Sequence, residues 1–324
     1  MKERTMKTRL ICASHSPLMY CYKKEPEHWD DLQSAFEEQA RALEEFDPEL
    51  VIAFGSDHFN GFFLRLMPAF CVGLQAEAVD DIGGFPGKLK VPGDLAIQLA
   101  ASLRTSNLDP AVSHQMTVDH AFSQTINLML GGLDKRPLIP IFINCINKPF
   151  VPFKRSRLLG EAVAEYVKSM DMRVLFLASG GLSHHPTRYY PAWGDGEKAV
   201  AAWQLSGGDH PDSLTREQWL KRLYDMHHEG AEMIAQGTRT AKDMFLNAEA
   251  DQRFLDVLSA GNLEEFDDWD QDEMVSEAGI GSMEQHTWIA ATAAHLACGG
   301  EKPRITHYSV ALEIGIAAGV AGAG

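Results

Sequence analysis

The chain has few cysteines, fewer basic than acidic residues, and no hydrophobic run long enough to span a bilayer. Its five cysteines are widely spaced without a CxxC pair, so neither a disulfide framework nor a zinc ribbon is predicted. The formal net charge of −16 argues against nucleic acid and anionic membranes as partners, because both bind basic surfaces. Met1–Lys7 lacks the apolar core of a signal peptide. We therefore expect a cytoplasmic protein without a membrane partner.

Short apolar segments alternate with amphipathic ones along the 324 residues. Six segments have the length and the β-branched or aromatic content of strands: Thr8–Ser14, Leu50–Gly55, Phe70–Leu74, Leu138–Asn144, Arg173–Ser179 and Arg304–Ala311. Five segments have helical patterns: Trp29–Phe46, Val91–Leu103, Ala121–Leu130, Ser156–Ser169 and Met283–Cys298. The alternation predicts an α/β fold with a central mixed β-sheet flanked by helices on both faces.

No Pro/Ser-rich linker interrupts the chain, so we expect one domain over residues 1–324. Residues from about 211 to 276 have helical patterns and many acids, which indicates a helical, acidic insertion in the C-terminal half. The acidic run at 264–270 is typical of a solvated face and not of a metal site. Residues 315–324 are short and glycine-rich, and we expect a flexible tail there.

Four histidines lie at or near the ends of apolar segments: His15, His58, His120 and His184. In open α/β sheets, ligands and metals gather outside the carboxyl ends of the strands, so these imidazoles can meet in one pocket. Histidine is also a common ligand for iron, zinc and copper. One such histidine could simply cap its strand, but the equivalent positions of His15 and His58 favour a metal site.

Two imidazoles alone hold a divalent metal poorly, so a third ligand is expected. Glu284 is the candidate, because it begins the helical segment that follows Gly279–Ser282. A glutamate in the first turn of a helix is also favoured by the helix dipole without any function. Two histidines and one carboxylate suit non-haem Fe(II), and the same ligands suit catalytic zinc.

His120 and His184 form a second pair of candidates. Asp119 precedes His120 and could raise its pKa or fix its tautomer. His184 ends a glycine-containing turn and is followed by His185; neighbouring residues in a strand point to opposite faces, so one of the two is expected to enter the pocket. No phosphate-binding glycine motif and no GxSxG elbow is present, which disfavours nucleotide binding and serine hydrolysis.

Five segments then occur in an order that is typical of one family: Cys12–Leu18, Asp57–Phe63, Val118–Phe122, Gly131–Lys135 and Ser179–His184. Together they resemble the class III, or LigB-type, extradiol ring-cleaving dioxygenases. The resemblance extends from about His15 to Trp288 and is weakest over Pro211–Glu273.

The resemblance implies that Fe(II) is bound by His15, His58 and Glu284, with His120 and His184 as the acid–base histidines. It also implies a homo-oligomer that uses O₂ to open a 3-substituted catechol beside its two hydroxyl groups. The substrate expected from it is 3-(2,3-dihydroxyphenyl)propionate or 2,3-dihydroxycinnamate, in aromatic catabolism.

The residues that bind the rest of the substrate are less well determined by the sequence. Asp119, Asn60 and His185 adjoin the site motifs and are candidates for substrate binding. A substrate carboxylate needs a cation or an amide donor, and Arg188, Lys148 or Asn60 could supply it.

Three alternatives keep the same fold: cleavage of another catechol or of an aminophenol, a zinc hydrolase with the same ligands, and a scaffold that has lost its metal. An acidic interaction protein without a site would explain the charge but not the five motifs.

Overall fold

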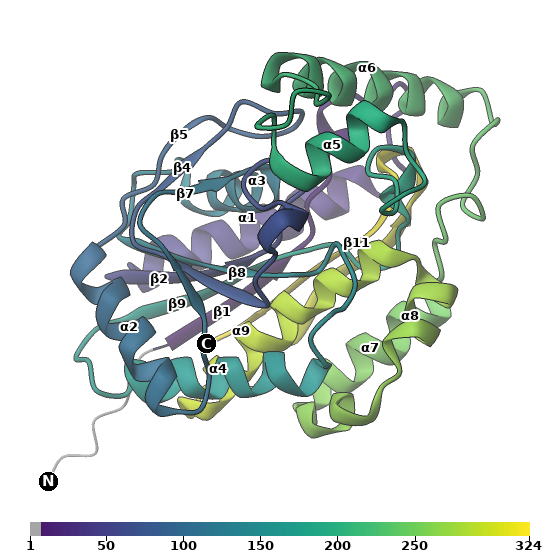
Figure 1. The fold of residues 1–324 in the computed structure, drawn as a ribbon. Coiled ribbons are helices and arrows are strands. Elements are labelled where there is room, and N and C mark those ends of the chain that lie inside the picture. Colours follow the sequence, from purple (N-terminus) through teal and green to yellow (C-terminus); the bar gives the residue numbers. More distant parts are fainter. Residues whose placement is uncertain (1–7) are drawn as a thin grey trace, which may run out of the picture.

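A computed structural model describes residues 8–324 of the chain (Figure 1). The expectation of no signal peptide rests on residues 1–7, which lie outside this range. None of the helices in the described part combines the length and apolar character needed to cross a membrane.

The centre of the structure is an eight-stranded mixed β-sheet, as predicted. Its strands in spatial order are β10 (Arg304–Ala311), β11 (Ile316–Ala323), β1 (Thr8–Ala13), β9 (Val174–Ser179), β2 (Leu50–Gly55), β8 (Leu138–Ile143), β3 (Phe70–Gly73) and β6 (Ala111–Ser113). β1, β9, β2 and β8 are mutually parallel, whereas β11 is antiparallel to β1 and β3 is antiparallel to β8. All six strands predicted from the sequence are present.

A second sheet has three short strands, β5 (Gly87–Lys88), β4 (Ala76–Ala78) and β7 (Met116–Val118). β4 and β7 are parallel, and β7 leads directly to the helix that begins with His120. None of these three strands was predicted, because each is only two or three residues long and has no alternating pattern.

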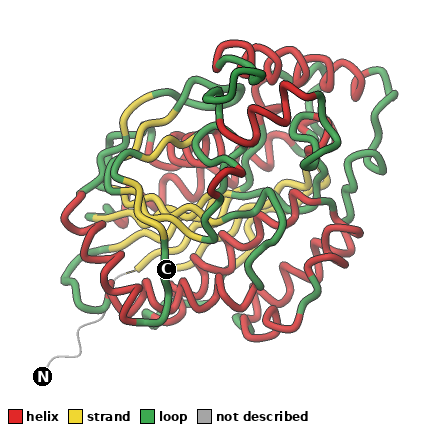
Figure 2. Tube along the Cα trace, viewed as in Figure 1, coloured by secondary structure: helices red, strands yellow, loops and turns green. Residues whose placement is uncertain are grey.

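Helices cover both faces of the large sheet (Figures 1 and 2). α1 (Trp29–Phe46) and α3 (His120–Leu130) lie on one face. α2 (Gly93–Thr105), α4 (Phe153–Val167) and α9 (Gln285–Ala297) lie on the other, where α9 packs between the sheet and α4. Eleven of the thirteen residues of α9 are buried, since it contacts protein on almost every side. The predicted helical segments are all confirmed.

The stretch from about 211 to 276 is helical, with α6 (Arg216–Ala235), α7 (Ala248–Ala260) and α8 (Gln271–Ala278). α6 and the preceding α5 (Lys198–Ser206) lie together in Figure 1 and share an aromatic cluster with the loop after β2. Trp203 of α5 stacks on Trp219 of α6 at 5.4 Å between ring centres. Whether the chain forms one domain stays a prediction.

The expectation of a flexible tail at residues 315–324 is wrong. β11 occupies Ile316–Ala323, every residue of the strand is buried, and it is hydrogen-bonded between β10 and β1. Its alanines and glycines have low strand propensity, but the two ladders and the helices above and below provide the missing stabilisation. The small side chains suit a strand that is covered on both faces.

The first prediction concerns this strand. Ile316→Ala removes a side chain that is 3% exposed, so we expect a loss of about 2–5 kcal/mol in unfolding free energy. Val310→Ala on the neighbouring β10, where the side chain is 40% exposed, serves as the control and is expected to cost less than about 1 kcal/mol. Urea denaturation measures both. Equal stability of Ile316→Ala and the wild type would contradict the burial of β11.

Candidate active site

The parallel strands bring their carboxyl ends to one edge of the sheet. Ala13 of β1 pairs with Ser179 of β9, and Phe54 of β2 pairs with Ala178, so these strands end at the same level. His15, His58 and His184 lie in the segments that follow them. This shared edge places side chains together that are more than a hundred residues apart in sequence.

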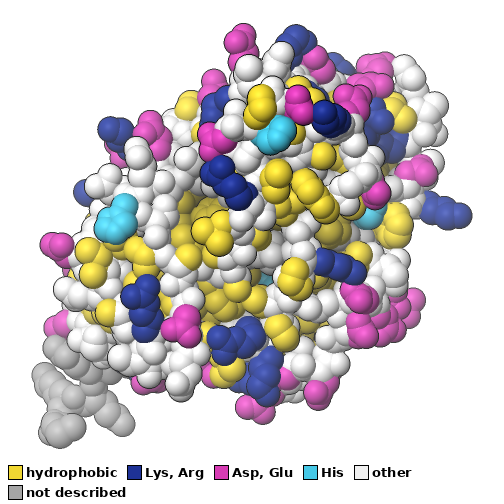
Figure 3. Space-filling model, viewed as in Figure 1, with side chains coloured by type: hydrophobic (Ala, Val, Ile, Leu, Met, Phe, Trp, Pro, Cys, Tyr) yellow, Lys and Arg dark blue, Asp and Glu magenta, His cyan; other side chains and the backbone are white. Residues whose placement is uncertain are grey.

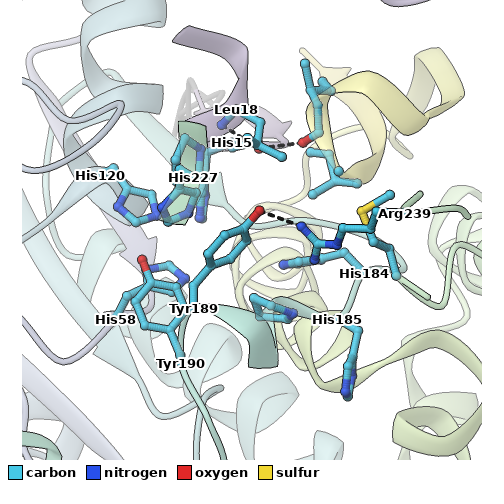
Figure 4. A pocket seen from close by; sticks show the side chains of 17 residues that line it. His15, Leu18, His58, His120, His184, His185, Tyr189, Tyr190, His227 and Arg239 are labelled. Atoms are coloured by element: carbon cyan, nitrogen blue, oxygen red, sulfur yellow. Dashed lines mark hydrogen bonds between the residues drawn. The ribbon is translucent and has the colours of Figure 1, made fainter. Parts of the chain in front are cut away.

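The histidines meet as the sequence predicted (Figure 4). The ring centre of His15 lies 5.8 Å from that of His58 and 5.4 Å from that of His120. The rings of His58 and His120 stack at 4.3 Å. All three side chains, and that of His184, are buried.

Glu284 joins this cluster at the end of a 3-10 turn, Ile280–Glu284, that leads into α9. Its Oε1 lies 3.4 Å from Nε2 of His15 and 3.6 Å from Nε2 of His58. Its Oε2 accepts a hydrogen bond of 2.6 Å from the backbone N–H of Gly181. Burial opposes ionisation of this carboxyl, but the imidazoles of His15 and His58 outweigh it and hold the pKa of Glu284 below its usual range.

Oε1 of Glu284 is the most informative atom of the site. It is buried and has no hydrogen-bond partner within residues 8–324. A buried carboxylate oxygen without a donor is costly, so a cation between Oε1 and the two Nε2 atoms would satisfy it. The chemistry of these donors therefore fits a metal ion.

Each of the two imidazoles is held through its other ring nitrogen. Nδ1 of His15 lies 3.0 Å from Oγ of Ser179, and Oγ of Ser179 lies 2.6 Å from Oγ1 of Thr125. Nδ1 of His58 lies 3.3 Å from Oδ2 of Asp119. Both Nε2 atoms are therefore left to face Glu284, which is how metal-binding histidines are normally oriented by outer partners.

Two further groups of ligand atoms lie close enough to hold a metal ion. His15, His58 and His120 offer one atom each within 4.8 Å of one another, and so do Asp81, Asp119 and His120. The second group is less suitable, because both oxygens of Asp119 already accept hydrogen bonds. Residues of this chain can therefore bind a metal ion here. His15 and His58 belong both to the group with Glu284 and to the group with His120, and these two groups are more suitable than the one around Asp119.

Asp119 supports His58 and α3 and does not line the cavity. Its Oδ1 accepts from the N–H of Ala121, and its Oδ2 accepts from the N–H of His58 at 2.7 Å and from Nδ2 of Asn60 at 3.1 Å. The amide oxygen of Asn60 accepts from Nε1 of Trp219. Burial opposes ionisation of the Asp119 carboxyl, but His58 and His120 hold the pKa of Asp119 well below its usual range. The structure places Asp119 and Asn60, both predicted to bind substrate, behind His58.

His120 has a different carboxylate partner from the one expected. Its Nδ1 lies 2.5 Å from Oδ2 of Asp81, which is 39 residues away in sequence. Burial lowers the pKa of His120 to about 4 against the opposing effect of Asp119, and burial together with Asp119 raises the pKa of Asp81.

His184 is held by its backbone and by two glycines. Nδ1–H donates to the carbonyl of Leu182 at 3.0 Å, which leaves Nε2 as an acceptor. Burial lowers the pKa of His184, although Glu284 opposes this, so the imidazole is neutral. A Cβ on Gly181 or Gly281 would lie 2.5 or 2.2 Å from its Cε1, so only glycine fits at either position.

A buried acid anchors the turn before His184. Asp251 of α7 accepts from the N–H of Ser183 at 2.7 Å and from its hydroxyl at 2.6 Å. The hydroxyl of Tyr308 on β10 donates to the same carboxyl at 3.0 Å. The helical stretch is therefore attached to the site, a link that the sequence did not reveal.

Two cavities meet at the cluster. The larger, of about 460 Å³, reaches Glu284 and is walled mainly by apolar side chains, including Ile146, Pro191, Trp193, Val275 and Ile280. The narrower, of about 40 Å³, is lined by His15, His120, Tyr189, His227 and Arg239 together with apolar side chains such as Leu18, Met244 and Ile314. Both cavities touch His58, His184, His185, Pro186 and Tyr190. Apolar side chains also gather around a hollow near the centre of the face in Figure 3.

Both members of the His184–His185 pair line the cavities, so the expectation that only one enters is wrong. The segment is a turn and not a strand, and strand alternation does not apply to it. His185 is half-buried and packs on Phe245 with 4.4 Å between ring centres.

Several residues of the site were missed by sequence reasoning. His227 has no motif around it and is not among the candidates from the sequence, yet it lines the narrow cavity and stacks on Tyr189 at 3.7 Å. Tyr190 lies 4.9 Å from the His58 ring, and its hydroxyl is buried without a hydrogen-bond partner among the described residues. The only sequence signal was that Tyr189 and Tyr190 follow His184 closely.

The chain belongs to the LigB family. The family described as the catalytic LigB subunit of aromatic ring-opening dioxygenase matches residues 9–320, and the protein is an enzyme of this kind. The predicted resemblance is thereby confirmed.

Several curated relatives share a single activity name, 2,3-dihydroxyphenylpropionate/2,3-dihydroxicinnamic acid 1,2-dioxygenase. The protein of this name from Rhodococcus rhodochrous is 40% identical over 91% of this chain and 90% of its own. That from Rhodococcus globerulus is 38% identical over 91% of both chains. A crystal structure of an uncharacterized protein from Escherichia coli K12 shares the fold, with a TM-score of 0.51, 12% identity and coverage of 98% of this chain and 99% of that one.

The second prediction concerns the anchor of His184. Burial raises the pKa of Asp251 from 3.8 to about 6, although its bonds to Ser183 oppose the shift. The pKa of Asp251 is higher in the folded than in the unfolded protein. The contribution of this carboxyl to the unfolding free energy is therefore complete below about pH 4 and is lost as the pH rises through about 6. We expect the unfolding free energy of the wild type, relative to Asp251→Asn, to fall by about 3 kcal/mol over this range. Urea denaturation at both ends of the range measures it, and a constant difference would contradict the assignment.

Proposed function

We propose that the protein uses Fe(II) and O₂ for extradiol cleavage of a 3-substituted catechol. The substrate is 3-(2,3-dihydroxyphenyl)propionate or 2,3-dihydroxycinnamate, the compounds in the names of relatives that are 37–40% identical. The observation that carries the proposal is Oε1 of Glu284, which lies buried between Nε2 of His15 and Nε2 of His58 and has no hydrogen-bond partner in the described part of the chain. A homo-oligomer and a cytoplasmic location complete the proposal; they rest on the resemblance and on composition.

His15, His58 and Glu284 would hold the iron. Two imidazole nitrogens and one carboxylate on one side of the metal are the ligands of non-haem Fe(II) oxygenases and leave positions open for other molecules. Bound there, Fe(II) supplies Lewis acidity and electron transfer between a catechol and O₂. The chain provides one anionic ligand, oriented by the N–H of Gly181.

His184 acts as the base. Its imidazole is neutral, its Nδ1–H is occupied by the carbonyl of Leu182, and its Nε2 lone pair is free. It lines both cavities and faces the region beside Glu284. Nε2 can therefore take a proton from a catechol hydroxyl as the substrate binds.

His120 acts as the acid, and Asp81 supplies its replacement proton. When Asp81 is protonated, its carboxyl donates a hydrogen bond to Nδ1 of His120, and Nε2 carries a hydrogen that can be donated into the cavity. As Nε2 releases that proton to an oxygen of the substrate, the proton of Asp81 moves to Nδ1. His120 thus never carries a full positive charge in its buried position, which agrees with its lowered pKa.

The third prediction tests the function directly. Protein reconstituted anaerobically with Fe(II) and ascorbate should consume one O₂ for each 3-(2,3-dihydroxyphenyl)propionate and form a yellow ring-opened product. An oxygen electrode and absorbance spectroscopy measure the two. If the protein cleaves only aminophenols or other catechols, the proposed substrate is wrong and the chemistry stands. Hydrolysis by the zinc-loaded protein, with no oxygen uptake by the iron-loaded protein, would support the hydrolase instead.

The fourth prediction separates the ligands from the acid–base residues. His15→Ala, His58→Ala and Glu284→Gln should lose iron, as measured by metal analysis after anaerobic purification. His120→Ala and His184→Ala should keep it and lose turnover by about 100-fold or more, because general acid–base catalysis contributes that much. Full iron occupancy in the first group, or near-normal turnover in the second, would refute the assigned roles.

A further inference from the structure

One buried cation at the site has no anionic partner among the residues that the structure describes. Arg239 lies in the loop between α6 and α7, is 6% exposed and lines the narrow cavity. Its Nη1 donates to the hydroxyl of Tyr189 at 2.5 Å, and its guanidinium lies 5.1 Å from the centre of that ring. Within residues 8–324 it forms no ion pair with an aspartate or glutamate. Figure 4 shows it beside the cavity, near His184.

A guanidinium does not lose its proton in proteins, so Arg239 stays charged. A buried charge is costly unless a counter-ion accompanies it. Arg239 contributes to lowering the pKa of Asp243, but Asp243 is exposed and accepts hydrogen bonds from the N–H and hydroxyl of Thr240. The charge of Arg239 is therefore left for a ligand.

The cations and the amide suggested by the sequence are all engaged elsewhere. Lys148 lines the larger cavity but is mostly exposed and pairs with Asp272 at 2.5 Å. Arg188 pairs with Glu229 at 2.7 Å and lines neither cavity. The amide of Asn60 is used by Asp119 and Trp219.

Helix α6 packs closely against the side chains of both Tyr189 and Arg239. A Cβ on Gly230 of α6 would lie 2.3 Å from the hydroxyl of Tyr189 and 3.1 Å from Nη1 of Arg239. His227, one turn earlier on α6, stacks on the Tyr189 ring. Glycine at this position lets the helix approach closely enough to hold both side chains at the cavity wall.

We propose that Arg239 binds the side-chain carboxylate of the catechol substrate, an inference that rests on the proposed function. The narrow cavity has room for about three water molecules, which suits a short acid chain and not a ring. The larger cavity accommodates an aromatic ring beside Glu284. With the ring there and the chain passing His184 and Tyr190, the carboxylate meets a guanidinium fork that can hold both of its oxygens.

The fifth prediction is a change of specificity in Arg239→Gln. Loss of a buried charge pair should lower kcat/KM for 3-(2,3-dihydroxyphenyl)propionate by about 100-fold, with little change for 3-propylcatechol, which lacks the carboxylate. Arg239→Lys keeps the charge without the fork and should give an intermediate loss. Arg188→Gln is the matched control and should behave as the wild type.

Calorimetry gives a readout that does not depend on turnover. 3-Phenylpropionate carries the acid chain without the catechol hydroxyls, and its binding should weaken in Arg239→Gln and not in Arg188→Gln. Gly230→Ala should weaken it too, because the added methyl group displaces Tyr189 and Arg239 while leaving every charge in place.

Several outcomes would overturn the inference. Equal losses on both substrates would make Arg239 structural, and a selective loss in Lys148→Gln would move the carboxylate to the larger cavity. If the wild type cleaves 3-propylcatechol with the same kcat/KM as the acid, the role of Arg239 is refuted and the proposed function is not. A wild type that cleaves neither compound would refute the proposed function, and the inference with it.

Discussion

The site depends on one electrostatic constraint: the carboxylate of Glu284 is kept ionised in the interior of the protein. Burial alone would raise its pKa, so the imidazoles around it and the N–H of Gly181 must remain in place. His15 and His58 reach Oε1 only because β1, β9 and β2 are parallel neighbours that end at the same edge. Glu284 reaches them because α9 packs along the sheet with its first turn at that edge.

The four histidines of the site have different properties because their Nδ1 atoms have different hydrogen-bond partners. Ser179 and Asp119 occupy Nδ1 of His15 and His58 and leave both Nε2 atoms to Glu284. Asp81 contacts Nδ1 of His120 at 2.5 Å, and a backbone carbonyl fixes the tautomer of His184. The polar atoms behind the cavity therefore decide which imidazole can bind a metal, donate a proton or accept one.

Much of this could be predicted from the sequence, because strands and amphipathic helices have short-range periodicities. The predicted strands, the mixed sheet and the convergence of the histidines needed only these patterns and the rule that ligands gather at the carboxyl ends of strands. β11 was missed because its alanines and glycines resemble a loose terminus until β1 and β10 pair with it. Glu284 was a weak candidate on spacing alone and gained weight only from the family resemblance.

The sequence by itself determined the order of the elements, the positions of the imidazoles beyond the strands, and the acidic surface charge. The tertiary structure alone decided that His120 pairs with Asp81, that Asp251 anchors Ser183, and that Arg239 is buried without an anionic partner in residues 8–324. The reason is physical: pKa values and the cost of a buried charge depend on desolvation and on distances of a few ångströms. Such contacts join residues far apart in the chain, and no local pattern encodes them.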